Sequence, residues 1–339
     1  MAQPTAVSPT ESPSTEGVQE ESSVEATAVS IPTTEATTEP IPEPMEDPIH
    51  LAIIWHQHQP IYFKDPETNS YVRPWVRMHA VKDYVDMVTI LEDYPDVHVT
   101  FNVTPSLIQQ LDDFAAGAKD DYWLHTETPA DQLSDEQKQF ILDRFFDTNR
   151  KIVTRFPRYA ELLDKRDNSA DALNEYTIED YRDLQLLFNL AWTDPDFLAQ
   201  EPLAALVAKG SNFDEADKAI VLGEHLRLIE ATVPILKAAQ DAGQIEVTMT
   251  PYAHPILPLL VNTDLARVAL PDIELPAQRF VYGQDAVAQV ERGVQLYTEK
   301  FGQPPRGMWP AEGSVAQEIV TMVAQNGLEW MATDEGVLA

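Results

Sequence analysis

Short apolar runs of strand length alternate with helical segments over most of this chain, and this alternation restricts its possible folds more than any other feature. Consecutive strands that are joined through a helix run parallel, because a parallel pair needs a long crossover connection. The first run is almost continuously apolar, which is typical of a strand covered on both faces. The predicted strands are residues 50–55, 97–103, 244–248, 306–309 and 329–333. The sequence therefore predicts an α/β protein with a parallel sheet.

Apolar residues at three- and four-residue spacing predict the helices between these strands. Those next to the sheet are residues 79–94, a segment that begins at Thr104 and Pro105, residues 285–300 and residues 313–326. A longer block follows the second strand, with helices predicted at 134–155, 178–192 and 214–242. Because this block is too long for one crossover, we expect a helical insertion beside the sheet over about residues 131–242.

The number of strands indicates how much of a barrel this chain can form. About five strands are predicted, whereas closing a parallel barrel takes roughly seven or eight. The last predicted strand leads directly into Asp334, and the sequence stops at Ala339. We therefore expect residues 49–339 to form the amino-terminal part of a barrel that is truncated at its carboxyl end.

Charge and composition limit the partners. The net charge of −33 and the pI near 4.3 argue against binding to nucleic acid or to an anionic membrane surface. A neutral polymer such as a polysaccharide is compatible with this charge. Without cysteine the chain can form neither a disulfide nor a zinc–thiolate site. No apolar run is long enough to span a bilayer, so membrane insertion is not expected.

Residues 1–48 differ in composition from the rest of the chain. They contain ten acidic residues, no Lys or Arg and no aromatic residue, and they are rich in Pro, Thr and Ser. Such a segment has too little apolar surface to offset the entropy of ordering it, so it is predicted to be disordered. Tethers of this composition often carry exported catalytic domains. We expect an extracellular or cell-envelope location, with a cytoplasmic protein bearing an acidic tail as the alternative.

Polar residues suited to a binding site follow the first strand. His56 and His58 are two residues apart and project from the same face of an extended chain. Gln59 and Pro60 come directly after them. Paired imidazoles at a strand end can bind a divalent metal or donate hydrogen bonds to substrate hydroxyls, and the residues leave both roles open.

A second candidate group follows the fourth strand, in the segment PPRGMWPAEGSV. Glu312 is predicted to lie where a strand ends and a helix begins, which is where ligands and catalytic groups collect in α/β folds. Trp309 would offer a stacking face for a sugar ring. The simpler alternative is that Glu312 caps the helix, since acidic residues are common in a first turn.

The remaining candidates rest on weaker arguments. Glu246 alternates with apolar neighbours in the third strand, and a carboxylate there needs an ionic partner or a polar cavity, such as a barrel mouth. His254 lies in the loop after that strand, where bracing the loop is the simpler role. Asp334 and Glu335 follow the last strand and lie near the same predicted rim as Glu312.

The segments WHQHQP, GQIEVT and WPAEGSV, in that order and strand context, resemble the first three signature regions of glycoside hydrolase family 57. The resemblance covers residues 49–339. It implies an incomplete seven-stranded relative of the eightfold barrel, no cofactor, and retaining cleavage or transfer of α-glucosidic bonds in starch, glycogen or pullulan. Glu312 matches the nucleophile position. The residues expected to line the sugar site are His56, His58, Gln59, Glu246 and Trp309, with Asp334 added from the same rim.

The implied mechanism needs a second carboxyl group. A retaining glycosidase holds it about 5 to 5.5 Å from the nucleophile, where it protonates the leaving oxygen. In the family that this sequence resembles, that group is an aspartate of a fourth motif, which this sequence does not show and which we expect beyond Ala339. The chain by itself is therefore expected to show negligible hydrolysis.

Two other classes of function remain open. A metal-dependent hydrolase or deacetylase would use His56 and His58 with a carboxylate such as Asp334 or Glu246, although no third ligand at metal spacing is evident. A non-catalytic glucan-binding module on an acidic tether is the other alternative.

Overall fold

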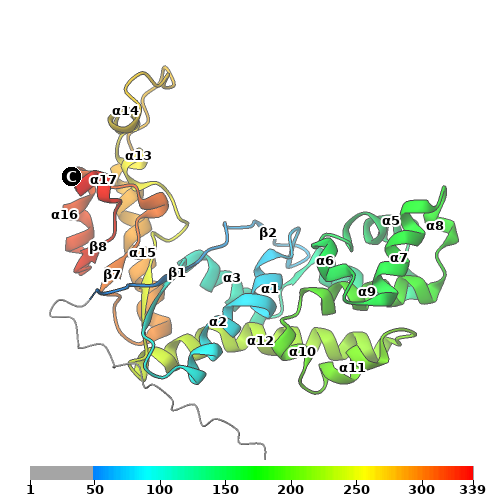
Figure 1. Ribbon diagram of the computed structural model, residues 1–339. Helices are drawn as coiled ribbons and strands as arrows, with labels where there is room; N and C mark the ends of the chain where they lie inside the picture. Colours follow the sequence, from blue (N-terminus) through cyan, green and yellow to red (C-terminus); the bar gives the residue numbers. More distant parts are fainter. Residues whose placement is uncertain (1–48, 339) are drawn as a thin grey trace, which may run out of the picture. The chain divides into compact units, whose positions relative to one another are not determined.

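The computed structural model describes residues 49–338, so the predicted disorder of residues 1–48 lies outside the described range. Five strands form one sheet in the order β1-β4-β6-β7-β8, and every neighbouring pair is parallel (Figure 1). The strands are β1 (Ile54–Gln57), β4 (Val99–Val103), β6 (Ile245–Met249), β7 (Gly307–Met308) and β8 (Trp330–Met331). The predicted α/β class is confirmed, and each predicted strand is present near its expected position.

The order of the strands in space follows their order along the chain. This is how the wall of a parallel barrel is built, whereas a doubly wound sheet reverses its order at a switch point. In the strand register, His56 lies level with Asn102 and Thr248. Glu246 lies level with Thr100, two residues nearer the amino ends of the strands. The loops that follow His56 and Thr248 therefore leave the sheet at the same edge.

One apolar core lies between the sheet and its helices. Alternate residues of β4 and β6 point into it, and it is closed by α3 (Pro105–Ala115), α15 (Gly283–Phe301) and α16 (Gln317–Gln325). The prediction that the first strand is covered on both faces is wrong, because Ile53, Ile54 and Trp55 are 39%, 37% and 45% exposed. Their exposure follows from the position of β1, which pairs only with β4 and forms one edge of the described sheet.

A second apolar core is formed mainly by helices between β4 and β6, and Met78, Val81 and Val85, which precede β4, also belong to it. The predicted helices 178–192 and 214–242 correspond closely to α9 and α12, because capping boxes at Thr177 and Asp214 fix where each begins. The predicted helix 134–155 is interrupted, since the side chain of Asn149 caps a new helix. The helices are α4 (Asp121–Glu127), α5 (Asp135–Arg144), α6 (Arg150–Val153), α7 (Pro157–Asn168), α8 (Ala172–Glu175), α9 (Ile178–Trp192), α10 (Pro195–Leu198), α11 (Leu203–Lys209) and α12 (Glu215–Asp241).

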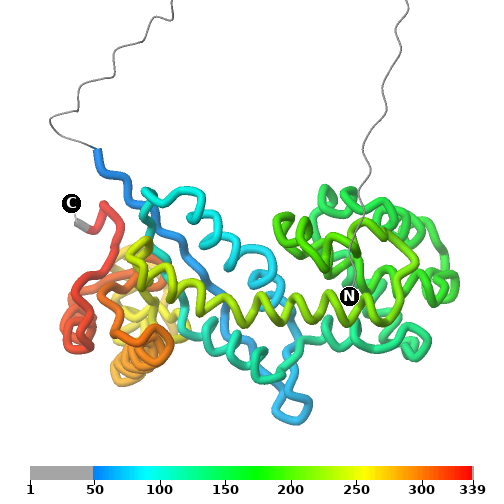
Figure 2. The backbone as a smooth tube through the Cα atoms, turned by 90° about the horizontal axis from the view of Figure 1, so that it is seen from below, coloured from blue at the N-terminus to red at the C-terminus, as the bar shows by residue number. Residues whose placement is uncertain are grey.

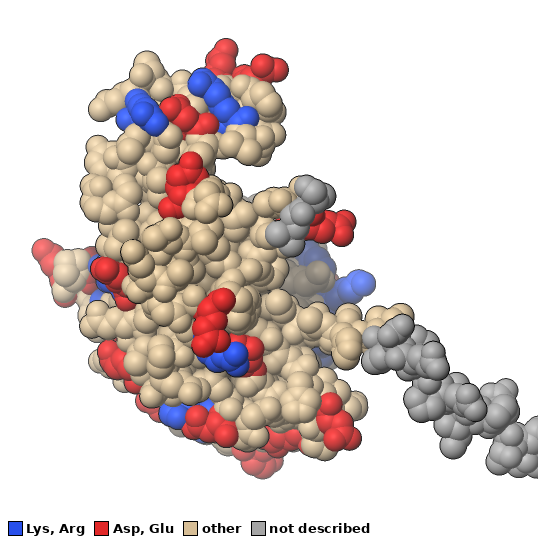
Figure 3. Space-filling model, turned by 90° about the vertical axis from the view of Figure 1, so that its left-hand side faces the viewer, with Lys and Arg blue, Asp and Glu red and all other residues tan. Residues whose placement is uncertain are grey.

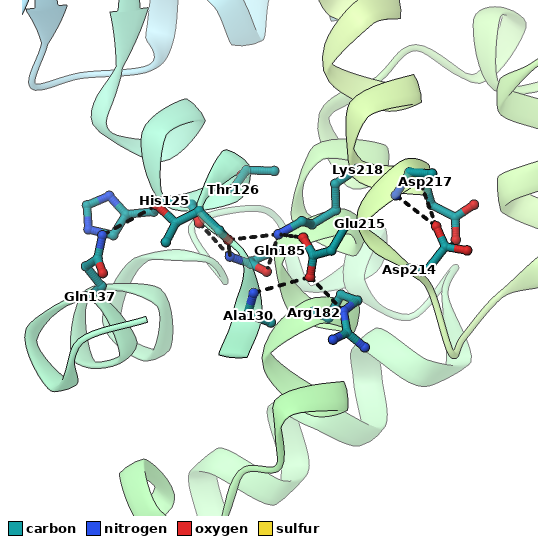
Figure 4. A network of polar contacts seen from close by, with 12 residues as sticks. His125, Thr126, Ala130, Gln137, Arg182, Gln185, Asp214, Glu215, Asp217 and Lys218 are labelled. Carbon is teal, nitrogen blue, oxygen red and sulfur yellow. Dashed lines mark hydrogen bonds and ion pairs between the residues drawn. The ribbon is translucent and has the colours of Figure 1, made fainter. Parts of the chain in front are cut away.

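The long helix α12 contacts both cores. It packs on α9 at one end and on α3 and β6 at the other, and Figure 2 shows its course between them. A buried polar network fixes it to α9 (Figure 4). Lys218, only 2% exposed, donates to Gln185 Oε1 and to the Thr128 carbonyl at 2.9 Å and pairs with Glu215 at 2.6 Å. Glu215 in turn pairs with Arg182 at 2.8 Å.

The remaining elements are short. Residues 79–94, predicted as one helix, form successive turns of α, π and 3-10 helix. A small second sheet pairs β2 antiparallel to β3 and β3 parallel to β5. These elements are β2 (Lys64–Asp65), β3 (Ser70–Tyr71), α1 (Trp75–His79), η1 (Ala80–Tyr84), α2 (Asp86–Thr89), η2 (Ile90–Asp93), β5 (Lys119–Asp120), η3 (Ala130–Gln132), α13 (Leu257–Val261), η4 (Thr263–Leu265), α14 (Ala266–Ala269), η5 (Ala311–Gly313) and α17 (Glu335–Leu338).

Two surface properties bear on the partners. Across residues 49–338, no helix is both long enough and apolar enough to cross a membrane. Figure 3 shows the side of the molecule on which α16 lies, and its Lys and Arg side chains are few and separate from one another.

Candidate active site

Three imidazoles meet at the carboxyl ends of β1 and β6. His56 lies in β1, His58 follows it, and His254 comes from the loop after β6. The ring centroids of His56 and His58 are 5.7 Å apart, and the ring of His254 lies 5.2 Å from the first and 4.1 Å from the second. The structure thus places the two predicted histidines side by side and adds a third from a distant part of the sequence.

A neighbouring strand orients His56. Its Nδ1 lies 2.6 Å from Oδ1 of Asn102, which is fully buried in β4 at the same level of the sheet. An amide oxygen only accepts hydrogen bonds, so Nδ1 carries the hydrogen in this pair. The Nε2 atom of His56 is then left with a free lone pair.

His254 is held in a tight turn. Its backbone N–H donates to the Pro251 carbonyl at 2.9 Å, and its φ angle is +56°. The side chain is 9% exposed, and its Nε2 is buried without a hydrogen-bond partner among the described residues. On the other side of the ring, Nδ1 lies 3.9 Å from Oε1 of Glu312.

Glu312 lies in the turn η5 between β7 and α16. Its side chain is 70% exposed on the rim, and its carboxylate faces His254. The helix α16 begins only at Gln317, so Glu312 does not cap it. The residue has φ +56° and is followed by Gly313 at φ +65°. The main chain therefore turns sharply here through two consecutive left-handed residues.

His254 and Glu312, which face each other across this site, both have a left-handed backbone conformation. Among the described non-glycine residues, those with positive φ are Asn69, Asn212, His254 and Glu312. Asparagine and histidine adopt this conformation more readily than most residues, whereas glutamate adopts it at a cost of roughly 1 to 2 kcal/mol. Such strain persists where the surroundings impose it and is concentrated at functional sites. Here the left-handed conformation occurs at the two residues that face each other.

Burial favours the neutral form of His58 and His254. It is the main cause that lowers the pKa of His58 to about 4, with repulsion from His254 and His56 adding to it. Burial also lowers the pKa of His254, which His56 lowers further and Glu312 partly restores. At neutral pH the rings of His58 and His254 therefore each have one N–H donor and one lone pair. Such a cluster can bind hydroxyl groups or a metal ion.

The other predicted residues of the rim lie in adjoining loops. Gln59 is buried next to His58, and its Oε1 accepts a hydrogen bond from the Tyr62 hydroxyl at 3.0 Å. Trp309 is half-buried at the end of β7, where its backbone N–H donates to the Met249 carbonyl at 2.9 Å.

The loop after β8 adjoins the turn that carries Glu312. Asp334 is exposed and accepts the N–H of Gly336 at 2.8 Å, at the start of α17. The preceding residue, Thr333, lies within 3.5 Å of the Gly313 carbonyl through its hydroxyl. Asp334 therefore borders the same rim as Glu312.

Glu246 is not brought to the three imidazoles. It lies near the amino end of β6 and lines a cavity of about 310 Å³ together with Ile53 and His98. The strand continues for three residues beyond it before the site is reached, which places Glu246 toward the opposite end of the sheet. Its Oε1 is buried without a partner among the described residues. The expectation that it faces the mouth of the barrel therefore does not fit its position.

His254 has a larger part in the site than the sequence alone predicts. The sequence favours a loop-bracing role for it and shows no third ligand at metal spacing beside His56 and His58. A usable signal was present, because His254 follows a predicted strand, as the first two histidines do. Loops after neighbouring parallel strands leave the sheet at the same edge.

Comparison with known proteins identifies the family. The sequence profile of glycosyl hydrolase family 57 matches residues 52–338. Alpha-amylase 1 of Dictyoglomus thermophilum is 30% identical over 100 residues, which are 30% of this chain and 12% of that protein. Two crystal structures are similar to 83% of this chain, and the match covers 38% of the chain in each of them. They are an α-amylase from Thermotoga maritima and a family 57 branching enzyme from Thermococcus kodakaraensis. Both are 17% identical to this chain, with TM-scores of 0.38 and 0.37.

These comparisons also give the share of each relative's length that the chain covers. The chain spans less than half the length of each of these relatives. The profile match, in contrast, runs through nearly all of the described residues and includes the three imidazoles and Glu312. This chain belongs to glycosyl hydrolase family 57.

Proposed function

We propose that this chain carries the nucleophile and part of the sugar site of a retaining glycoside hydrolase or transglycosylase that acts on α-glucans. Starch, glycogen and pullulan are the substrates in view, and an extracellular or cell-envelope location is proposed with them. The main support is the position of Glu312, whose carboxylate lies 3.9 Å from His254 at the carboxyl ends of parallel strands. Two facing residues with positive φ, His254 and Glu312, are the second support.

In the proposed reaction Glu312 attacks the anomeric carbon. A carboxylate oxygen forms a bond to that carbon while the glycosidic C–O bond breaks, and the leaving oxygen takes a proton from a general acid. Water or a sugar hydroxyl then displaces Glu312 and restores the carboxylate, and its proton passes to the group that acted as general acid in the first step. Glu312 is exposed on the rim and so is open to an incoming sugar.

The neighbouring residues would bind and orient the sugar. His56 can accept a hydrogen bond from a sugar hydroxyl through Nε2, since its Nδ1–H is bound to Asn102, and the rings of His58 and His254 can donate one. Such bonds accelerate the reaction where they strengthen in the transition state. Trp309 offers an indole face beside the turn. A neutral polymer also suits a chain whose net charge is −33.

Covalent trapping tests this proposal directly. We expect a 5-fluoro-α-glucosyl fluoride to label Glu312, because fluoride leaves without help from a general acid and the fluorinated intermediate is hydrolysed slowly. The trapping therefore does not depend on identifying the proton donor, whereas starch hydrolysis by this chain alone is expected to be negligible. Labelled peptides would be identified by mass spectrometry.

Two variants make the assignment specific. Glu312→Gln should abolish labelling, while Glu318→Gln, an exposed glutamate in α16, should leave it unchanged. Labelling of another carboxylate in the parent chain would contradict the proposed role of Glu312, and so would undiminished labelling of Glu312→Gln.

A further inference from the structure

The three imidazoles also have the geometry of a metal-binding site. One ligand nitrogen from each of His56, His58 and His254 lies within 4.8 Å of the other two. Bound Zn²⁺ has Zn–N distances of about 2.0 to 2.1 Å, so nitrogens in a tetrahedral site are about 3.4 Å apart and the ring centroids about 5 Å. The observed centroid separations of 4.1, 5.2 and 5.7 Å lie around that value. The rings of His56 and His58 are stacked at 24° and those of His58 and His254 at 27°, so the side chains would have to rotate to direct their nitrogens at one ion.

The surroundings of His56 are those of a metal ligand. A ligating histidine usually donates its second ring N–H to an oxygen, which fixes the tautomer and orients the ring. His56 does this through Nδ1, 2.6 Å from Oδ1 of the buried Asn102. Its Nε2 lone pair then remains for an ion.

His254 gives an independent indication. Its side chain is more than nine-tenths buried, and Nε2 has no hydrogen-bond partner among the described residues. A buried nitrogen without a partner is costly, and a coordinated ion would satisfy it. The opposite nitrogen, Nδ1, is 3.9 Å from the Glu312 carboxylate. This distance is longer than a hydrogen bond, but the carboxylate lies on the side of the ring where a carboxylate–histidine–zinc arrangement has it.

We propose that His56, His58 and His254 bind one Zn²⁺ ion per chain, with the fourth position open to solvent or another ligand. Three nitrogen donors suit zinc and similar borderline ions, whereas Ca²⁺ and Mg²⁺ prefer sets of oxygen ligands. The proposal goes beyond the glycosidase function and does not depend on it. It also supplies the third ligand that the metal-dependent alternative lacked in the sequence.

Calorimetric titration of ZnCl₂ into the full 339-residue chain tests this site. Millimolar MgCl₂ should be present, because the chain carries 56 acidic residues that bind divalent ions weakly. We expect one Zn²⁺ per chain. His254→Ala should lower the affinity at least tenfold, and His58→Gln should do the same while keeping a polar side chain in the cluster. The matched control is His98→Ala, which removes an exposed histidine outside the cluster and should leave the affinity unchanged.

A spectroscopic measurement separates a built site from scattered binding. CoCl₂ should give the visible absorption of a tetrahedral Co²⁺ site in the parent chain and in His98→Ala but not in His254→Ala, with circular dichroism showing that each variant is folded. Absence of Zn²⁺ binding would overturn the proposal, as would equal affinity in the three histidine variants. Neither result bears on whether Glu312 is labelled by the fluorosugar, so the two proposals can fail separately.

Discussion

Two buried histidines of this chain have opposite surroundings. His225, in α12, uses both ring nitrogens: Nδ1 lies 3.0 Å from Nη1 of Arg77, and Nε2 lies 2.9 Å from the Thr193 hydroxyl. Because a guanidinium only donates, Nδ1 of His225 accepts and Nε2 carries the hydrogen. His254, at the ends of the strands, has a buried Nε2 without a partner among the described residues and a left-handed backbone.

The groups around the two histidines differ in the same way. Arg77 donates from Nε and Nη2 to both oxygens of Asp120 at 2.6 and 2.9 Å and from Nη1 to Asn189 at 2.7 Å. Arg77 and Asp120 are completely buried. This cluster is satisfied by the protein itself and joins α1, β5 and α9 to α12. The cluster at His254 is not satisfied in this way, and we infer that it is kept for a ligand rather than for stability.

The largest expected effect comes from breaking the satisfied cluster. Arg77→Met should lower the free energy of unfolding by about 3 to 5 kcal/mol, because it leaves the buried Asp120 carboxylate without its partner. His254→Ala should change it by no more than about 1 kcal/mol, since no hydrogen bond of the ring nitrogens to described residues is lost. Urea denaturation followed by circular dichroism measures both.

A double variant separates charge from packing at Arg77. Arg77→Met with Asp120→Leu removes the unpaired carboxylate and should recover part of the lost stability. Equal destabilisation by Arg77→Met and His254→Ala would show that the two clusters play similar structural roles, contrary to the comparison.

The pH dependence of stability gives a smaller effect of about 2 kcal/mol. Burial, and then repulsion from Arg77, hold the pKa of His225 well below the ordinary value of 6.5. Below pH 6.5 the unfolded chain therefore binds a proton at this residue and the folded chain does not. The free energy of unfolding falls by about 1.4 kcal/mol per pH unit, or about 2 kcal/mol at pH 5.

A variant assigns that pH dependence to one residue. His225→Gln cannot titrate, so its stability should fall by about 2 kcal/mol less than that of the parent between pH 7 and pH 5. The lowered pKa values of His58 and His254 act in the same direction in both chains and cancel in the comparison. Parallel pH profiles of the parent and His225→Gln would contradict the neutral, buried state of His225.

Local signals explain which parts of the fold were predictable. Helices α9 and α12 begin at capping boxes formed by Thr177 and Asp214. Residues of these types mark helix starts in a sequence, so the starts could be placed closely. The exposure of Trp55 could not, since it depends on which strands pair with β1. Periodicity records the apolar character of a strand but not its place in the sheet.

Local sequence signals likewise predicted some residues of the candidate site and missed others. His56 and His58 share a strand end, so their proximity followed from local geometry alone. His254 joins them from nearly 200 positions further along the chain, and only the strand register brings it there. Glu246 shows the reverse, because its alternating pattern gave the face of the strand correctly but not its height along the sheet. The motifs therefore predicted which strands carry the site better than how far along each strand a given residue lies.

The smallest effect, of about 1 kcal/mol, tests the strain at the strand ends. Glu312 has φ +56°, a conformation that glycine adopts without steric cost, so Glu312→Gly should raise the free energy of unfolding by up to about 1 kcal/mol while abolishing fluorosugar labelling. The matched control is Glu318→Gly, the same substitution at an exposed residue with helical φ in α16, which should lower stability by about 1 kcal/mol. Opposite signs would show that the fold holds Glu312 in this turn at a cost to its own stability. Destabilisation by both substitutions would mean that the turn carries no such strain, and the contrast with the satisfied cluster at His225 would then rest on the unpartnered nitrogen of His254 alone.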